Sequence, residues 1–211
     1  MHDSQSSAII AYFWLPALAY LLGSIPWGVL LTRAFTSVDI RRRGSGNIGM
    51  TNVSRVAGST LGLLTFVGDV LKGAVPVYLS VILAGKQQGT AELLPVAAAL
   101  AAFFGHLYPL YMKFKGGGKG VATCAGCFAV LAPPACLSAM MIFILMLFST
   151  KRVSAASLSA AAILPWAAWL SAGTSYITAT AVLMAVLIFW RHTDNIKRLI
   201  SGTEPKLGKK P

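Results

Sequence analysis

The sequence predicts an all-α, polytopic integral membrane protein with seven transmembrane helices, some of them short, with its N-terminus outside and its C-terminus in the cytoplasm. Of the 211 residues, 56% are apolar and 11% are charged, and the mean hydropathy is +0.70. Soluble domains carry about 25% charged residues, so lipid must surround much of this chain. The formal net charge of +12 is typical of the positive-inside bias of membrane proteins, and we expect no nucleic-acid partner.

The apolar runs are long enough for several spans. Runs of about 20 residues cross a bilayer, and such runs cover residues 8–32, 59–84, 93–112, 153–172 and 175–190. The first run is expected to remain in the protein as a span and not to be cleaved as a signal peptide. A signal peptide begins with a basic region, and no basic region precedes this run. The run 121–149 contains Pro133-Pro134, and a proline pair ends a helix more readily than it bends one. We therefore divide this run into two short helices, which gives seven segments.

Basic residues predict the orientation of these segments. Lys and Arg gather in four clusters, at 33–55, 113–119, 151–152 and 191–210, whereas only Lys86 lies in the connection 85–92. Seven segments place all four clusters on the cytoplasmic side. A six-span alternative treats 121–149 as one kinked helix and leaves two clusters on the wrong side. We expect one membrane domain over 1–211, with 1–7 outside and a basic cytoplasmic tail at 199–211.

Two glycine-rich segments predict anion binding on the cytoplasmic side. Residues 41–55 combine an arginine cluster with three glycines among hydroxyl and amide side chains, which lets backbone N–H groups face an anion. Residues 114–123 form a glycine turn with Lys119 that opens into an apolar helix, an arrangement suited to phosphate. This turn is not a Walker A loop, because Gly120 follows the lysine where that motif has Ser or Thr.

Other polar residues accompany these segments. Residues 191–204 follow the last span and 151–157 precede the span at 153–172; capping and contact with lipid headgroups are the simpler interpretations of both. Asp69 and Lys72 lie within one span at i, i+3, so each can neutralise the other where an unpaired charge is costly. His106 lies near the cytoplasmic end of its span, where it is either a hydrogen-bonded core histidine or a site residue.

The polar motifs together resemble those of the bacterial membrane acyltransferases that acylate glycerol 3-phosphate from acyl phosphate, the PlsY family. The matching motifs run in order along nearly the whole chain: Gly23-Ser24-Ile25-Pro26, Ser45-Gly46-Asn47-Ile48-Gly49-x-Thr51-Asn52, Asp69-x-x-Lys72-Gly73, Gly105-His106-x-x-Pro109, residues 117–123, and His192-x-x-Asn195-Ile196-x-Arg198-Leu199 with Glu204. Two positions depart from the family pattern. Met50 stands where Ala is usual, and 116–118 has three glycines where two are usual.

The resemblance implies direct attack of the 1-hydroxyl of sn-glycerol 3-phosphate on the acyl phosphate carbonyl, giving lysophosphatidic acid and inorganic phosphate. The proton of the hydroxyl could pass to His192, His106 or the departing phosphate. The expected catalytic residues are Ser45, Arg55, Lys119, His192 and Asn195. The expected substrate- and phosphate-binding residues are Asn47, Thr51, Asn52, Lys72, His106, Gly116, Gly117, Gly118, Ser154, Ser157, Arg198 and Glu204.

We expect no cofactor and no metal. The spacing Cys124-x-x-Cys127 lies in an apolar run without a companion His or Cys, which favours helix packing over a metal or redox site. The expected partners are acyl phosphate, glycerol 3-phosphate and the bilayer of the bacterial inner membrane, with a monomer as the working assumption and the active site facing the cytoplasm. A small anion transporter or channel is the alternative, which needs cations along a pore; the density of motifs argues against a purely structural membrane protein.

Overall fold

The computed structural model describes residues 2–84, 92–173 and 175–208, and the regular elements of these residues are all helical. Two of them are single turns of 3₁₀ helix, η1 (Ile40–Arg42) and η2 (Leu110–Met112). The α-helices in chain order are α1 (His2–Gly23), α2 (Trp27–Phe35), α3 (Met50–Ala57), α4 (Ser59–Ala84), α5 (Leu93–Leu107), α6 (Val121–Leu131), α7 (Pro133–Thr150), α8 (Val153–Ala172), α9 (Ser175–Arg191) and α10 (Thr193–Ile200). The prediction of an all-α protein is confirmed.

Several of these helices can cross a membrane. Four stretches are long and apolar enough by themselves: Ser59–Ala84, Leu93–Met112, Pro133–Thr150 and Val153–Ala172. Two further candidates are bent pairs, in which α1 meets α2 at 42° and α9 meets α10 at 62°. Helix α6 is apolar but has only 11 residues. The described part of the chain therefore has four to six candidate spans and one short apolar helix.

The first apolar run, 8–32, is not one uninterrupted span. Helix α1 ends at Gly23, and α2 begins at Trp27, directly after Pro26. Proline has no N–H with which to continue the helix, so the chain bends there. The carbonyl oxygen of Ile25, at the break, accepts a hydrogen bond of 2.9 Å from Lys72 Nζ on α4. The predicted span over this run therefore consists of a bent pair of helices.

The run 121–149 divides at its proline pair, as predicted. Helix α6 ends at Leu131 and α7 begins at Pro133, because prolines fit the first turn of a helix, where their missing N–H is not needed. Ala132 between the helices is extended, with φ −151° and ψ 77°, since a residue before proline is held out of the helical region. Met141 and Phe148 of α7 are 63% and 79% exposed, which suits a face surrounded by lipid.

Helices α4 and α6 approach closely because small residues line their contact. A side chain on Gly73 would overlap the backbone of α6, and one on Gly126 would overlap the backbone of α4. Cys124 and Cys127 are buried and free in the same contact region. Small residues of this kind let membrane helices pack closely, so the prediction that the C-x-x-C pair serves helix packing is confirmed.

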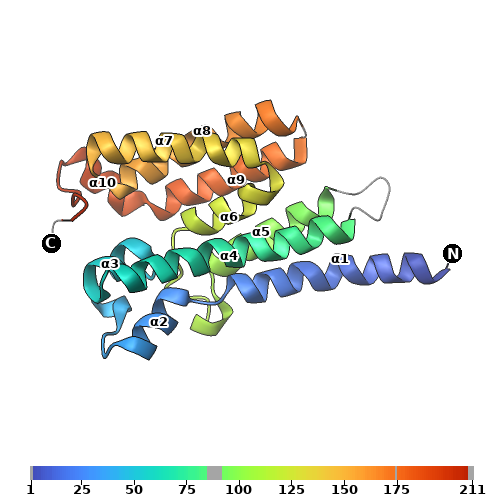
Figure 1. The fold of residues 1–211 in the computed structure, drawn as a ribbon, viewed down its shortest axis with the longest axis horizontal. Helices are drawn as coiled ribbons and strands as arrows, with labels where there is room; N and C mark the ends of the chain where they lie inside the picture. Colours follow the sequence, from blue (N-terminus) through green and yellow to red (C-terminus); the bar gives the residue numbers. More distant parts are fainter. Residues whose placement is uncertain (1, 85–91, 174, 209–211) are drawn as a thin grey trace.

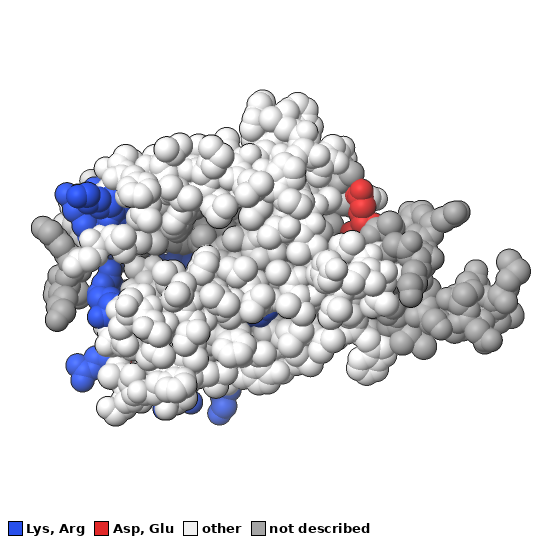
Figure 2. Space-filling model, in the orientation of Figure 1, with Lys and Arg blue, Asp and Glu red and all other residues white. Residues whose placement is uncertain are grey.

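Polar connections gather at one end of the molecule. The connection from α2 to α3, the turn from α7 to α8 and helix α10 lie at the left of Figure 1, and the N-terminus lies at the right. Most of the visible Lys and Arg side chains occupy the same left end and its lower edge, whereas the visible acidic surface lies at the opposite end (Figure 2). This asymmetry agrees with basic clusters on one side of a membrane. The predicted external connection at 85–91 and Lys209 and Lys210 of the basic tail lie outside the described residues.

Candidate active site

A pocket of about 470 Å³ lies where three segments that are distant in the sequence meet. The segments are the α2–α3 connection, the glycine-rich loop before α6, and the junction of α9 with α10. The residues that line the pocket are Ser45, Gly46, Asn47, Gly116, Gly117, Lys119, Trp190, Arg191, Thr193, Asp194, Asn195 and Arg198. Three of them are Lys or Arg and one is Asp, so the pocket is suited to an anion.

Asn52 organises the α2–α3 connection from behind the pocket. It lies near the start of α3 and is 2% exposed. Its Oδ1 accepts the N–H of Ser45 at 2.9 Å, and its Nδ2 donates to the carbonyl oxygens of Arg43 and Asn47 at 3.0 and 2.9 Å. Gly46 has a φ of +70°, a conformation that favours glycine. Asn52 therefore holds Ser45 and Asn47 at the pocket without lining it.

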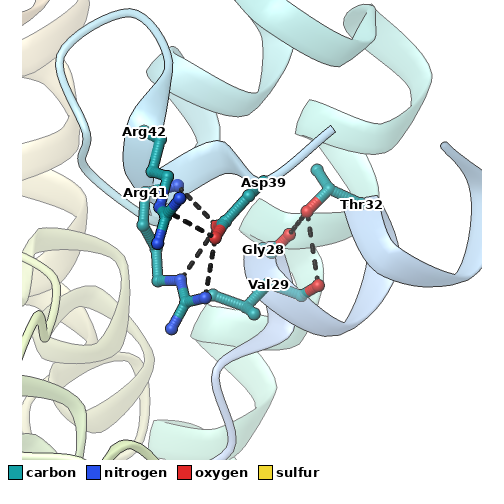
Figure 3. A network of polar contacts seen from close by, with 6 residues as sticks. All are labelled: Gly28, Val29, Thr32, Asp39, Arg41 and Arg42. Carbon is teal, nitrogen blue, oxygen red and sulfur yellow. Dashed lines mark hydrogen bonds and ion pairs between the residues drawn. The ribbon is translucent and has the colours of Figure 1, made fainter. Parts of the chain in front are cut away.

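The arginine run within this connection, residues 41–43, does not line the pocket. Arg41 donates to both carboxylate oxygens of Asp39, from Nε at 2.8 Å and from Nη2 at 2.7 Å, and Arg42 Nε lies 4.0 Å from Asp39 Oδ2 (Figure 3). The hydrogen bonds from Arg41 hold the pKa of Asp39 well below its usual range. Arg41 is thus paired with Asp39, and the arginine run stays outside the pocket lining.

Each of the three glycines in the loop before α6 is required for a different structural reason. Gly116 has a φ of +68°, which favours glycine. A Cβ on Gly117 would overlap the carbonyl of Leu107, and one on Gly118 would overlap the imidazole of His106. Gly116 and Gly117 line the pocket, whereas Gly118 faces His106. The two glycines that can address a ligand are therefore Gly116 and Gly117.

Arg191, the last residue of α9, holds this loop in place. Its Nε donates to the carbonyl oxygen of Gly118 at 3.1 Å, and its Nη2 donates to that of Gly117 at 2.5 Å. The side chain also lines the pocket, so it contributes a positive charge there. Arg191 is not among the predicted site residues, because a single arginine at a helix end does not indicate which loop it reaches.

A chain of polar contacts joins the loop to α10. Lys119 Nζ donates to Asn195 Oδ1, and Asn195 Nδ2 donates to Glu204 Oε1 at 2.6 Å. Glu204 Oε2 accepts from Arg198 Nε at 2.7 Å. Burial opposes the ionisation of Glu204, but the donor groups of Ser154, Asn195 and Arg198 around the carboxylate outweigh it, so the pKa of Glu204 is lowered. A carboxylate can only accept, so Glu204 fixes the amide of Asn195 with its oxygen toward Lys119.

Two titratable groups beside the pocket have lowered pKa values. Burial lowers the pKa of Lys119 to about 8, although Glu204 attracts its positive charge. Burial and the nearby charge of Lys119 lower the pKa of His192 to about 4. His192 is 3% exposed, and its Nδ1 lies 2.8 Å from the carbonyl oxygen of Ile188, so Nδ1 carries the proton and Nε2 is an acceptor. At neutral pH the site therefore combines a protonated lysine with a neutral histidine.

Lys72 and His106 lie behind the glycine-rich loop and not in the pocket. Lys72 Nζ is 2.7 Å from Asp69 Oδ1 on the same helix, α4, which confirms that the two charges pair. Asp69 Oδ1 also lies 3.6 Å from His106 Nδ1 on α5. All three residues are at most 5% exposed, and none of them belongs to the pocket lining.

The predicted site residues fall into two groups. Those that line the pocket are Ser45, Asn47, Gly116, Gly117, Lys119, Asn195 and Arg198. Those outside its lining are Arg55, Thr51, Asn52, Lys72, His106, Gly118, Ser154, Ser157, His192 and Glu204. Thr51 and Arg55 lie on α3, and Ser154 and Ser157 are buried in the first turns of α8. Besides Arg191, the lining residues absent from the predicted site residues are Gly46, Trp190, Thr193 and Asp194; of these, Gly46 belongs to the glycine-rich segment that the sequence singled out.

Residues 13–202 match a family model described as glycerol-3-phosphate acyltransferase. The chain belongs to this glycerol-3-phosphate acyltransferase family. A relative from Syntrophotalea carbinolica, named glycerol-3-phosphate acyltransferase, is 47% identical over 194 residues, which cover 92% of this chain and 96% of the relative. A relative of the same name from Myxococcus xanthus is 46% identical over 198 residues, which cover 90% and 96% of the two chains.

Solved structures of the acyltransferase family share the fold. The crystal structure of PlsY, an integral membrane glycerol 3-phosphate acyltransferase, in its glycerol 3-phosphate form has a TM-score of 0.86 at 34% identity, and the match covers 93% of this chain and 96% of that one. The lysophosphatidic acid form has a TM-score of 0.84 at 34% identity, with 93% and 95% covered. The predicted resemblance is confirmed, and this acyltransferase is a multi-pass bacterial membrane protein.

Proposed function

We propose that this acyltransferase moves a fatty acyl group from acyl phosphate to the 1-hydroxyl of sn-glycerol 3-phosphate, giving lysophosphatidic acid and inorganic phosphate, the first step of phospholipid synthesis. The observation that carries the proposal is the convergence of Lys119, Arg191 and Arg198 on one pocket, whose other walls include two glycine turns. Both substrates carry a phosphate group. Cationic side chains and backbone N–H groups are the partners that phosphates prefer in proteins.

The reaction needs no covalent intermediate on the protein. Acyl phosphate is an activated mixed anhydride, so the substrate hydroxyl oxygen can attack its carbonyl carbon directly. The new ester bond forms, the bond between the acyl carbon and the phosphate oxygen breaks, and the electron pair leaves with the phosphate. The protein contributes positioning and charge stabilisation, and we assign the charge on the departing phosphate to Lys119, with Arg191 and Arg198 beside it.

We assign the hydroxyl proton to the departing phosphate. The pKa of His192 is about 4, which is too low for an efficient base near neutral pH, whereas a phosphate group has a pKa of about 6. The unprotonated Nε2 of His192 can instead accept a hydrogen bond that orients the hydroxyl. His106 is separated from the pocket by the glycine-rich loop.

The membrane arrangement belongs to the same proposal. We assign seven segments to the single domain 1–211, with the N-terminus outside and the C-terminus and the pocket on the cytoplasmic side of the inner membrane. The gathering of Lys and Arg at the end that holds α10 supports this orientation (Figure 2). Trp190 lines the pocket and is 56% exposed, as expected of an aromatic side chain at the membrane interface. The acyl chain would then reach the pocket from the bilayer, and one chain supplies the described lining, so a monomer suffices.

A small anion transporter is the less suitable function for this pocket. A transporter places its binding groups near the bilayer midplane and opens to both sides in turn. Here the cations come from the loop before α6 and from the α9–α10 junction, at the ends of helices. This placement favours an enzyme that works at one membrane face.

Donor specificity tests the proposal. Purified protein is given labelled glycerol 3-phosphate with acyl phosphate, acyl-CoA or acyl carrier protein in parallel, and labelled lysophosphatidic acid and free phosphate are measured. We expect product only with acyl phosphate, with one phosphate released for each ester formed. The Lys119→Ala variant, prepared in the same way, controls for a contaminating enzyme. A comparable rate from acyl-CoA without any acyl phosphate would refute the assigned donor.

A further inference from the structure

The buried cluster of Asp69, Lys72 and His106 has no part in the mechanism above, although ionisable side chains inside a membrane protein are costly. Asp69 Oδ1 lies 2.7 Å from Lys72 Nζ and 3.6 Å from His106 Nδ1. Lys72 also donates to the carbonyl oxygen of Ile25 at 2.9 Å. The cluster therefore ties α4 to the break between α1 and α2, and places the Asp69 carboxylate beside the buried imidazole of His106 on α5.

The cluster meets the active site at Gly118. The N–H of Gly118 donates to the carbonyl oxygen of His106 at 3.2 Å, and a Cβ on Gly118 would overlap the imidazole ring. The carbonyl oxygen of Gly118 accepts from Arg191 Nε at 3.1 Å. Gly118 is thus held between His106 and Arg191, and the next residue is Lys119. A displacement of the ring would move the backbone that carries the lysine.

We propose that His106, which is buried beside the Asp69–Lys72 pair, is a positioning residue whose imidazole ring supports the glycine-rich loop at the pocket. The imidazole supports the loop through Gly118, so that Gly117 and Lys119 present their polar groups to phosphate. Asp69 and Lys72 neutralise each other beside the ring, and removing either partner would leave an uncompensated buried charge. The effect on turnover rests on the proposed function, whereas the support of the loop does not.

Alanine substitutions at the two neighbouring glycines test this support. Gly118→Ala places a methyl group against the His106 ring, and Gly117→Ala places one against the backbone carbonyls of His106 and Leu107. His106→Ala removes the ring but not the carbonyls. We expect Gly118→Ala to lower kcat/KM at least about tenfold in the wild type and less than about threefold in the His106→Ala background, as for residues in contact. Gly117→Ala, the matched control, should be equally damaging in both backgrounds.

Trypsin reports the position of the loop without any turnover. Lys113 and Lys115 are exposed just before the glycines, and Arg42 is exposed in the α2–α3 connection, with 87% of its side chain accessible. We expect His106→Ala to speed cleavage after Lys113 or Lys115 at least about threefold relative to cleavage after Arg42, because local opening increases when a support is lost. If His106→Ala yields no folded protein, His106→Asn replaces it, because this variant also removes the imidazole ring beside Gly118. The kinetic comparison and the trypsin comparison are then both made with His106→Asn.

Two results would overturn the proposal. One is a Gly118→Ala defect of the same size with and without the His106 ring. The other is cleavage that accelerates equally after Arg42 and after Lys115, as in a protein that is destabilised throughout. A wild-type protein that transfers no acyl group would refute the proposed function instead, and the trypsin comparison would still decide the role of His106.

Discussion

Replacement of Lys119 by alanine is the most direct test of the assigned chemistry. Lys119 lines the pocket, and its ammonium bonds Asn195 Oδ1. A hydrogen bond to a charged group contributes about 1.5–3 kcal/mol, which corresponds to about 10- to 150-fold in rate. We expect Lys119→Ala to lower kcat/KM by at least this factor, because the departing phosphate gains charge in a partly dry site. Folding in detergent should be retained, since Lys119 belongs to a loop and supports little packing.

The role of Lys119 also predicts the direction in which kcat/KM changes with pH. The pKa of Lys119 is about 8, so the ammonium is present below this pH and is lost above it. Since kcat/KM reports the ionisations of the free enzyme, kcat/KM should fall as the pH rises through about 8. The Lys119→Arg side chain stays charged over the whole pH range, so kcat/KM of this variant should not fall as the pH rises through 8. Its highest kcat/KM should be lower than that of the wild type, because the guanidinium has a different shape from the ammonium.

Lys115→Ala is the internal control for both measurements. Lys115 is exposed and does not line the pocket, so we expect its kcat/KM to change less than about twofold, as for most surface substitutions. Size-exclusion profiles and thermal unfolding of each variant check that the fold is intact. Equal and modest losses in Lys115→Ala and Lys119→Ala, together with a wild-type profile that is flat through pH 8, would refute the assignment of Lys119 to phosphate.

Three further predictions concern the surroundings of Lys119 and the membrane orientation. The pKa of His192 falls from 6.5 to about 4 on folding, so the unfolded state binds more protons between these pH values. The free energy of unfolding should therefore fall by up to about 3 kcal/mol as the pH is lowered through this range. His192→Gln should lose this acid dependence in thermal unfolding, and the same pH dependence in the variant and the wild type would contradict the prediction. Glu204→Gln lets the amide of Asn195 turn, because Gln can donate as well as accept, and should lower kcat/KM about tenfold; unchanged kinetics would exclude this orienting role. A single cysteine at Gln87 should react with an impermeant reagent from outside the cell and one at Ser201 should not, and reaction of both would contradict the seven-segment arrangement.

The sequence by itself determined the fold class and the division of the chain. Hydropathy and charge are properties of local segments, so they predict helices in lipid and a basic end without knowledge of the packing. Pro133-Pro134 ends a helix through the covalent geometry of proline, and this break was predicted. Pro26 has the same property, but the length of the apolar run concealed the bend. The glycine-rich loop before α6, which lines the pocket, was also predictable, because glycine, cation and helix start are consecutive in the sequence.

Only the tertiary structure decided which polar groups face the pocket. Lys72 and His106 have the residue types of a phosphate site, but Asp69 and the packing of α4 against α5 hold them behind the glycine-rich loop. Arg191 lies more than 70 residues from Gly117 in the sequence, and helix packing brings its guanidinium to the loop carbonyls. A cationic side chain can bind a ligand or pair with another group of the protein. Which of the two it does depends on contacts between distant segments, and the spacing of residues along the sequence does not predict these contacts.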